Sequence, residues 1–598
     1  MKSNPFTLVL AVFFTMISSQ TSILKSQIND QGSNTGRDQN FYSDFPDPYL
    51  NPSGDRQGTI TAKTEEILPP GILPVIFLQG SDYEMGVQYG KQAGQFIEIN
   101  KEAAWAEALQ RYSRDEIIQA LKANQHYIQK YTPENIDIMK GMADGAAAAG
   151  YDVSYIDIVL LNCTLPKPET STYPKGTEHD TLPPRKSCSV CSAWGSTTKD
   201  GRLIGMDTLD GGGDAFYGVI IVAFPDEGNA YICGAQAGEI GDHFLMNNKG
   251  LFVGNSGGGG SPRDIDNNYG LAWACSLPHL ARFANTAKEA RDLITSWQIN
   301  VPENFHFVDV KGNAFVVEKT ATVQAVRKPG DFGEKDFLYS TNNYLHEKMK
   351  MPKEGGFIKQ HGGYGAYSAP RNLVLWDMLH NYHGLVDVEF IKMILRFPGN
   401  PPPYPPDGGW DAKICRPTNS WVSVLQPHDG DEGVAHICTG PAGRVIHASM
   451  ASSGEPMRSN YQYIDGTHTF YKLHLTKNPK AVADLAKKDA KDALAAAYKE
   501  FMQWTPKDPG FGALNQIYSS ANAEYYRGNL ALNKALLSGG NDALAQFARA
   551  ATAFTRCQAR AMQVYEAFIP PATSPSYLGL KPFGGTWAEW ETNVGKAE

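Results

Sequence analysis

The sequence predicts an α+β protein in which a strand-rich middle lies between two helical regions. Three observations predict this fold class. Apolar residues recur with a helical period before about residue 150, short strand-like runs alternate with Gly, Asn and Asp turns after Cys188, and the chain beyond Pro479 is rich in alanine. Strands flanked by helices are typical of a layered core. With 598 residues, the chain is long enough for more than one domain or layer.

The N-terminal region is expected to be one short strand followed by helices. The apolar run Val75–Leu78, which ends in a Gly-Ser-Asp turn, is typical of a strand. Helices are expected at Gln92–Leu109, Arg114–Leu121 and Pro133–Ala149. The following stretch, Pro166–Ser187, is rich in proline, which resists regular structure. We therefore expect an irregular, accessible segment directly before Cys188.

The middle of the chain is expected to contain most of the strands, and the tail to be helical. An Asp-Gly pair at 200–201, a strong hairpin signal, joins the first two strands. Strands are expected at Cys188–Trp194, Arg202–Met206, Tyr217–Phe224, Ala230–Cys233, Gly250–Val253, Asn304–Val310, Ala314–Glu318, Val323–Arg327, Ser420–Leu425, Ala435–Thr439 and Arg444–Met450. Helices are expected at Thr286–Ser296, Ala369–His380, Ala481–Trp504 and Asn541–Phe568.

The first 22 residues have the pattern of a signal peptide. Lys2 supplies a positive charge, Phe6–Ile17 is an apolar run too short to span a bilayer, and small residues follow. An uncleaved membrane anchor is the alternative. We expect a secreted or periplasmic protein with no stable membrane span once the signal is removed. Residues 23–70 are polar and are expected to form a linker or arm.

The charge of the chain argues against a general nucleic-acid binder. The formal net charge is −9 and the pI is about 5.9, so no basic surplus is present to neutralise phosphates. No metal-site or organic-cofactor motif stands out, and we expect neither group.

Two cysteines three residues apart, Cys188 and Cys191, raise the question of which one is chemically active. A redox dithiol needs its first cysteine at a helix N-terminus, but a strand–turn–strand pattern follows here. A zinc site needs a second pair at similar spacing. A disulfide or two inert thiols is the plain alternative. A third possibility is a nucleophilic cysteine at a new chain N-terminus, because the freed α-amine can take the proton of the thiol in the same residue.

Two further motifs are weak. Gly254–Gly258 satisfies GxSxG, but the glycines and proline that follow cannot start the helix that a nucleophile elbow requires. His380 and His383 lack an accompanying acidic ligand, so a histidine pair at a helix end is favoured over a metal site.

At Ser187–Asp210 the chain resembles the N-terminal-nucleophile hydrolases of the penicillin acyltransferase type, the C45 peptidase family. Acid ceramidase and the choloylglycine hydrolases are more distantly similar. In this resemblance Cys188, rather than Cys191, occupies the nucleophile position and Asp210 the aspartate position. The other matching motifs, in chain order, are Gly80–Gly86 with Gly90, Met246–Leu251, Thr341–Leu345 and Arg371.

The resemblance implies a four-layer αββα sandwich and a self-cleaving cysteine amidohydrolase or acyltransferase. Cys188 would attack the Ser187 carbonyl, free its own amine, and then take the acyl group of an N-acylated small molecule. Asp210 would orient that amine, and Asn342 with Asn255 would hold the oxyanion, with Asn247 as the alternative to Asn255. Arg371 would support Asn342 or bind a carboxylate.

The implied domain organisation follows from the cleavage point. We expect a helical propeptide-like region at 71–187, a hydrolase core at 188–475 and a helical C-terminal extension at 476–598. The two self-cleaved chains are expected to stay associated.

The sequence departs from the family pattern at one position beside the nucleophile. Asp207 stands where the family has an arginine that steadies the cysteine. An acid pointing inward there raises the pKa of the Cys188 thiol unless another group compensates. Two alternatives therefore stay open: a lipid amidase or phospholipase-B-like hydrolase on the same fold, and a non-catalytic secreted binding protein that retains the fold.

Overall fold

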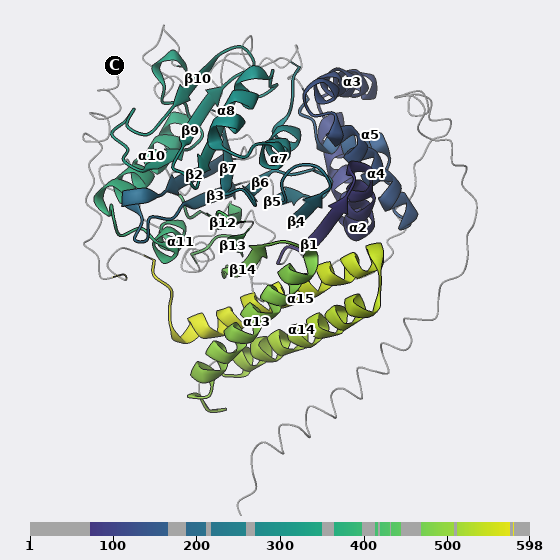
Figure 1. Ribbon diagram of the computed structural model, residues 1–598. Coiled ribbons are helices and arrows are strands. Elements are labelled where there is room, and N and C mark those ends of the chain that lie inside the picture. Colours follow the sequence, from purple (N-terminus) through teal and green to yellow (C-terminus); the bar gives the residue numbers. More distant parts are fainter. Residues whose placement is uncertain are drawn as a thin grey trace, which may run out of the picture. The chain divides into compact units, whose positions relative to one another are not determined.

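The structure is a computed structural model that describes most of the chain beyond residue 71. The described residues are 72–165, 187–210, 217–258, 269–349, 364–397, 413–416, 419–430, 432–443, 468–507, 511–573 and 578. The expected signal peptide, the linker, the proline-rich stretch and the strand at Arg444–Met450 lie outside them. Within the described residues the chain is a mixed α/β protein with two β-sheets (Figure 1).

The larger sheet has eight strands and contains the N-terminal strand. Its spatial order is β1-β4-β5-β6-β7-β8-β9-β10, and β1 pairs in parallel with β4 whereas every other neighbouring pair is antiparallel. The strands are β1 (Val75–Gly80), β4 (Gly218–Pro225), β5 (Tyr231–Gln236), β6 (His243–Asn247), β7 (Leu251–Gly257), β8 (Glu303–Asp309), β9 (Ala314–Lys319) and β10 (Gln324–Arg327).

The smaller sheet has six antiparallel strands and carries Cys188. Its spatial order is β11-β2-β3-β12-β13-β14. The strands are β2 (Ser187–Ala193), β3 (Ile204–Asp210), β11 (Phe337–Ser340), β12 (Asn419–Pro427), β13 (Gly433–Thr439) and β14 (Tyr471–Leu475).

Helices precede, interrupt and follow the strands. The helices before β2 are α2 (Asp82–Leu109), α3 (Arg114–Tyr131), α4 (Glu134–Ala148) and α5 (Tyr155–Leu161). Those among the strands are α7 (Trp273–Phe283), α8 (Ala287–Ser296), α10 (Tyr364–Asn381) and α11 (Val388–Arg396), with 3-10 turns η3 (Gly195–Thr197) and η4 (Glu347–Met349). The last helices are α13 (Pro479–Phe501), α14 (Phe511–Leu537) and α15 (Gly540–Phe568).

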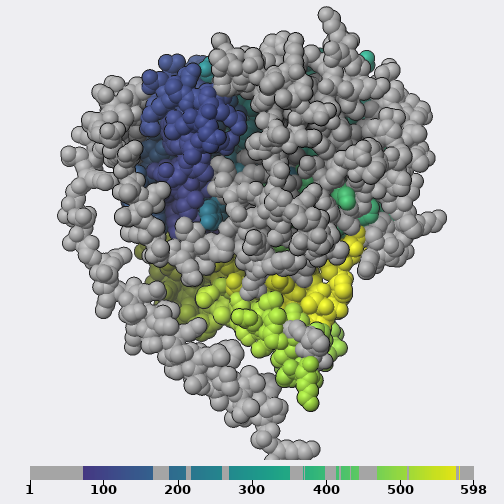
Figure 2. Space-filling model, turned by 180° about the vertical axis from the view of Figure 1, so that it is seen from behind, coloured from purple at the N-terminus to yellow at the C-terminus, as the bar shows by residue number. Residues whose placement is uncertain are grey.

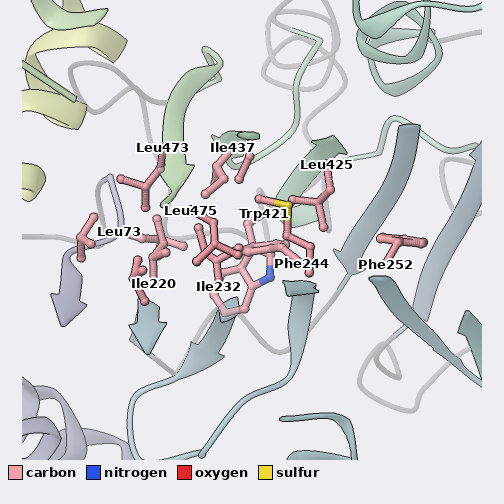
Figure 3. Close-up of a cluster of buried hydrophobic side chains, with 14 of the residues drawn as sticks. Leu73, Ile220, Ile232, Phe244, Phe252, Trp421, Leu425, Ile437, Leu473 and Leu475 are labelled. Atoms are coloured by element: carbon pink, nitrogen blue, oxygen red, sulfur yellow. The ribbon is translucent and has the colours of Figure 1, made fainter. Parts of the chain in front are cut away.

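One buried apolar cluster contains side chains from both sheets. The eight-stranded sheet contributes Ile220, Ile232 and Phe244, and the six-stranded sheet contributes Trp421 and Leu473 (Figure 3). The rings of Phe244 and Trp421 meet edge to face, 5.7 Å between centroids. Each side chain of this size that leaves water contributes about 1.5–3 kcal/mol, so this cluster joins the two sheets through a shared core.

Each sheet also packs against helices. The six-stranded sheet shares a second apolar cluster with α10 and α11, which includes Cys191, Met206 and Ile391. The eight-stranded sheet contacts α2, α7 and α8. The side-chain amide of Asn100 on α2 donates to the carbonyl oxygens of Tyr217 and Ala237, which ties that helix to the sheet.

Glycines allow α2 and α4 to pack backbone against backbone. A Cβ added at Gly86 would lie 2.1 Å from the Ile138 carbonyl oxygen, and one at Gly90 would lie 2.1 Å from that of Met142. Ser81, directly before α2, forms a capping box with Glu84. The Gly80–Gly90 motif therefore starts the first helix and sets its distance from α4.

The C-terminal helices have an alanine-rich core of their own and pack against strands of both sheets. The Thr552 hydroxyl on α15 accepts a hydrogen bond from the Val75 N–H of β1, and the Gln558 side chain pairs with the Lys472 backbone of β14. They are green to yellow in Figures 1 and 2. Among the described residues, no helix is long and apolar enough to cross a membrane.

Several elements were not anticipated in the sequence. These are α5, β6, α7, β11, α11 and β14, whereas α14 lies in the tail that is expected to be helical, and α2 and α3 are longer than expected. Most of the missed elements are short, and α7 carries Pro278 inside the helix. Short or proline-containing segments give little periodic signal, so tertiary packing decides their structure.

Candidate active site

Strand β2 places its two cysteines on opposite faces of the six-stranded sheet. Successive side chains in a strand alternate, so residues three apart face opposite ways. Cys188 lies in the cluster between the sheets, and Cys191 lies in the cluster beneath α10 and α11. This geometry excludes a Cys188–Cys191 disulfide or dithiol and leaves the two sulfurs in separate environments.

The backbone nitrogen of Cys188 is held by Asn342, which follows β11. The Cys188 N–H donates to Asn342 Oδ1 at 3.0 Å, and the Asn342 Nδ2 donates to the Gly257 carbonyl oxygen at 3.0 Å. Asn342 is fully buried. The side chain that we expected to hold an oxyanion therefore contacts the nitrogen of the expected nucleophile, and its oxyanion role stays a prediction.

Arg371 on α10 connects Asn342 with the backbone of β2. Its guanidinium donates to the Cys188 carbonyl oxygen at 2.7 Å, to Ser189 Oγ at 2.8 Å and to Asn342 Oδ1 at 2.7 Å. Only 1% of the residue is exposed. An arginine fork is suited to such planar recognition, because its donors point in fixed directions. Arg371 therefore supports Asn342, one of the two expected contacts.

Asp210 ends β3 on the face that Ser189 and Thr208 share. Its carboxylate accepts hydrogen bonds from Arg416 and Asn419, and one from the Thr208 hydroxyl at 3.2 Å. Asp210 pairs across the strands with Ser187, so its backbone lies beside the bond expected to be cleaved. Its expected contact with a freed Cys188 amine stays a prediction.

A histidine that the sequence reading did not single out lies beside the Cys188 sulfur. The distance from Cys188 Sγ to His243 Nε2 is 3.8 Å. His243 Nδ1 lies 3.1 Å from each carboxylate oxygen of Asp207, and Nε2 lies 3.4 Å from Asp242 Oδ1. Cys188 and the two acids come from three separate segments, which only the folded chain brings together.

An irregular strand start aims His243 at Asp207. The β5–β6 pairing shifts register between Ile232 and Gly234, and Phe244 has φ of 53°, in the left-handed region that favours glycine. The Phe244 N–H donates to Asp207 Oδ2 at 3.1 Å. A Cβ at Gly234 would lie 2.2 Å from the Phe244 ring, so this glycine makes room for the bend.

Burial and neighbouring charges both act on the cysteine and the histidine, and together they raise the pKa of each group. Burial raises the pKa of the Cys188 thiol, as do the carboxylates of Asp210 and Asp207, whereas His243 lowers it. Burial alone lowers the pKa of an imidazole, but Asp242, Asp207 and Cys188 together raise the pKa of His243 well above its ordinary value. The site therefore favours a charged imidazolium beside the sulfur.

The structure does not bring Asn255 to this site. On β7 the inward-facing neighbours are Gly254, whose added Cβ would meet Val190, and Ser256, whose hydroxyl donates to the Thr341 carbonyl oxygen. The regular register of β7 puts Asn255 on the opposite face of the eight-stranded sheet. The expected oxyanion role of Asn255 is therefore wrong, because side chains alternate along β7 and that of Asn255 faces away from Cys188.

Asn247, the alternative to Asn255, has a structural role. Its amide donates to the carbonyl oxygens of Ala281 and Ala284 at the end of α7, and its oxygen accepts from the N–H groups of Lys249 and Leu251. The Met246–Leu251 motif thus forms a hairpin turn and anchors a helix end.

The comparisons with known proteins found one related sequence and several distant structural neighbours. No family model matches the chain. An uncharacterized protein of Archaeoglobus fulgidus is 30% identical over 190 residues, which are 30% of this chain and 32% of that protein. The match thus spans about a third of the length of that relative.

The solved structures found include, by their titles, an acid amidase, a penicillin acylase and a bile acid hydrolase. The match to an N-acylethanolamine-hydrolyzing acid amidase ortholog from Caenorhabditis elegans covers 40% of this chain and 93% of the ortholog's chain, with a TM-score of 0.28 and 14% identity. A penicillin V acylase from Agrobacterium tumefaciens covers 42% and 83%, with a TM-score of 0.26 and 9% identity. A conjugated bile acid hydrolase mutant from Clostridium perfringens covers 42% and 89%, with a TM-score of 0.26 and 14% identity.

Proposed function

We propose that this protein is a self-processing cysteine amidohydrolase or acyltransferase of the N-terminal-nucleophile type, with Cys188 as its nucleophile. The observation that carries this proposal is the contact between the Cys188 nitrogen and Asn342 Oδ1 at 3.0 Å, supported from behind by Arg371. The nitrogen that cleavage would free as an amine is already held by a buried acceptor.

In the first stage the chain cleaves itself before Cys188. The thiol sulfur attacks the Ser187 carbonyl carbon, the thiol proton passes to the Cys188 nitrogen as the C–N bond breaks, and the acyl group moves from nitrogen to sulfur. Water then hydrolyses the thioester, which leaves a carboxylate on Ser187 and a free amine on Cys188. That amine is a base with a pKa near neutrality, so it can accept the thiol proton within the same residue.

In the second stage Cys188 takes the acyl group of an N-acylated small molecule. The thiolate attacks the amide carbonyl carbon, and the leaving amine receives the proton held by the α-amine. Water or a second amine then attacks the thioester and releases the acyl group. The developing oxyanion needs fixed donors. Asn342 is the proposed source of one donor, through movement of its Nδ2 from the Gly257 carbonyl oxygen.

The proposed organisation is a four-layer αββα core with two attached helical regions. The two sheets with a shared core, and helices packed against each of them, support the four layers. We place the N-terminal chain at 71–187, the core at 188–475 and the extension at 476–598. Strand β1 pairs along its length with β4, so this pairing would keep the two cleaved chains together. The proposed location is secreted or periplasmic.

The contacts of Asp207 support a catalytic protein over a non-catalytic binding protein. The acid that replaces the family arginine contacts a histidine beside the nucleophile, which is an arrangement suited to chemistry rather than to its loss. The described residues provide no specific feature that favours a phospholipase-B-like activity, so the amide reaction is the proposal.

The test is amine release from a panel of N-acyl amides with aliphatic, aryl and steroid acyl groups. We expect the wild type and a Cys191→Ala variant to release amine from at least one substrate. The Cys188→Ala variant should release none, and a trapped acyl group should appear on Cys188 in peptide mass spectra. Undiminished release by Cys188→Ala, or equal release by both variants on every substrate, would overturn the proposal.

A further inference from the structure

We propose that His243 supplies the positive charge that stabilises the Cys188 thiolate, and that Asp207 holds this imidazole in place. The inference rests on the proposed nucleophilic role of Cys188. His243 contacts the reacting sulfur and is therefore a candidate catalytic residue, whereas Asp207 is a positioning residue.

The imidazole of His243 lies directly beside the sulfur of Cys188. His243 Nε2 is 3.8 Å from Cys188 Sγ, within the range of a hydrogen bond to sulfur, and only 2% of His243 is exposed. Charges this close interact strongly when water is excluded. An imidazolium here lowers the free energy of the thiolate relative to the thiol, as a neighbouring cation does in other reactive cysteines.

Acids on two sides keep the imidazole of His243 charged. Asp207 faces Nδ1 from β3, and Asp242 faces Nε2 from the turn before β6. Asp242 Oδ2 is buried and has no hydrogen-bond partner among the described residues. A buried carboxylate is stable only with a charge or hydrogen-bond partner, so both acids favour the imidazolium over the neutral ring.

Other charged groups also face the cysteine and the histidine. The groups that act on His243 are Asp242, Asp207 and Cys188, and those that act on Cys188 are His243, Asp210 and Asp207. Asp210 is itself paired with Arg416. Of the charged groups that act on Cys188, His243 lowers the pKa of the thiol, whereas Asp210 and Asp207 raise it.

The thiol proton of Cys188 goes to a group other than His243. An imidazole held between two carboxylates keeps its proton during the reaction, so it is not the base that removes the thiol proton. That proton goes to the freed amine of Cys188, and from there to the leaving amine. His243 thus keeps its charge while the sulfur gains and loses its own, and no bond to His243 forms or breaks.

The test is the pH dependence of Cys188 alkylation by iodoacetamide, measured on the full-length protein. Trypsin releases residues 187–199 from an uncleaved chain and residues 188–199 from a chain cleaved before Cys188. Fragment spectra separate alkylation at Cys188 from alkylation at Cys191. The same experiment therefore reports self-cleavage through the peptide's first residue and thiolate formation through the rate, so failure of either proposal is recognised separately.

We expect His243→Gln to move the alkylation midpoint of Cys188 to higher pH by about one unit or more, which is a roughly tenfold lower rate at neutral pH. The double variant His243→Gln/Asp207→Arg should move the midpoint back towards that of the wild type, because it places a cation on β3. His306→Gln is the matched control: His306 is equally buried but bonded to Ser192, and its loss should leave the midpoint unchanged.

A second measurement covers variants that fail to fold and a sulfur that the reagent does not reach. With ¹⁵N-labelled histidine in the wild-type protein, we expect the His243 ring to be doubly protonated at neutral pH, and Asp207→Asn to lower the pH at which it loses its charge. An unchanged alkylation midpoint in folded His243→Gln, or a neutral His243 ring at neutral pH in the wild type, would overturn the proposal.

Discussion

Replacing Arg371 with methionine should slow self-cleavage as well as destabilise the fold. The substitution removes hydrogen bonds of 2.7–2.8 Å to the Cys188 carbonyl oxygen, Ser189 Oγ and Asn342 Oδ1, and a longer one of 3.3 Å to Ser368 Oγ. A hydrogen bond from a charged donor contributes about 1.5–3 kcal/mol. The loss of Arg371 also removes the desolvation cost of its own charge, so we expect a total of about 3–5 kcal/mol rather than the sum.

The effect on cleavage follows from the position of Asn342. Without Arg371, Asn342 no longer holds the Cys188 nitrogen in one place, and misplacement of a reacting group by about 1 Å lowers a rate roughly 100-fold. Cleavage is followed by intact mass over time, and stability by the denaturant midpoint. Arg371→Lys keeps the charge but not the fork, so its cleavage rate should be intermediate.

Arg282→Met is the matched control for Arg371→Met. Arg282 is also buried, and it donates to the Glu227 carbonyl oxygen and to Asp82, away from Cys188. The control should lose stability yet cleave at the wild-type rate. A folded Arg371→Met protein that cleaves as fast as the wild type would refute the reasoning.

Two further predictions concern the fold around the site. Gly86→Ala should lower the free energy of unfolding by about 1–3 kcal/mol, because the added Cβ would lie 2.1 Å from the Ile138 carbonyl oxygen. Gly512→Ala is the control and should cost no stability, because nothing lies within 4 Å of its added Cβ. Equal denaturation midpoints for the two variants would contradict the close packing of α2 on α4. Burial and Arg327 lower the pKa of His306 from 6.5 to about 3, so its stabilising contribution is present above pH 6.5 and lost as the pH falls towards 3. Melting temperatures of the wild type and His306→Gln should therefore converge on acidification, and parallel curves would show that folding does not lower the pKa of His306.

The candidate site residues that the structure brings together are those whose signal is local in the sequence. Cys188 follows a proline-rich stretch and opens a strand before an Asp-Gly turn, and Asn342 and Arg371 lie in or near recognisable motifs. The structure brings these three into direct contact. The coarse fold was also readable, because long helices and alternating strands have clear periods.

The residues that sequence reasoning missed or misplaced depend on strand parity and on irregular backbone. Asn255 is one residue out of phase with the inward-facing positions of β7, and a shift of one residue reverses the face of a side chain. His243 begins a five-residue strand with a left-handed residue at Phe244, which leaves no alternation to detect. The one sequence signal for His243 was Asp207 itself, because a buried acid beside a nucleophilic cysteine needs a nearby cation to offset its charge.

The central claim is that Cys188 becomes the N-terminus of a second chain. The most direct measurement is the intact mass and N-terminal sequence of the purified protein, beside Cys188→Ala and Cys191→Ala variants. We predict that the wild type and Cys191→Ala split into two chains, one of which begins at Cys188, and that Cys188→Ala stays whole. A wild-type protein that remains a single chain after long incubation, or a Cys188→Ala protein that still splits at this bond, would contradict the account.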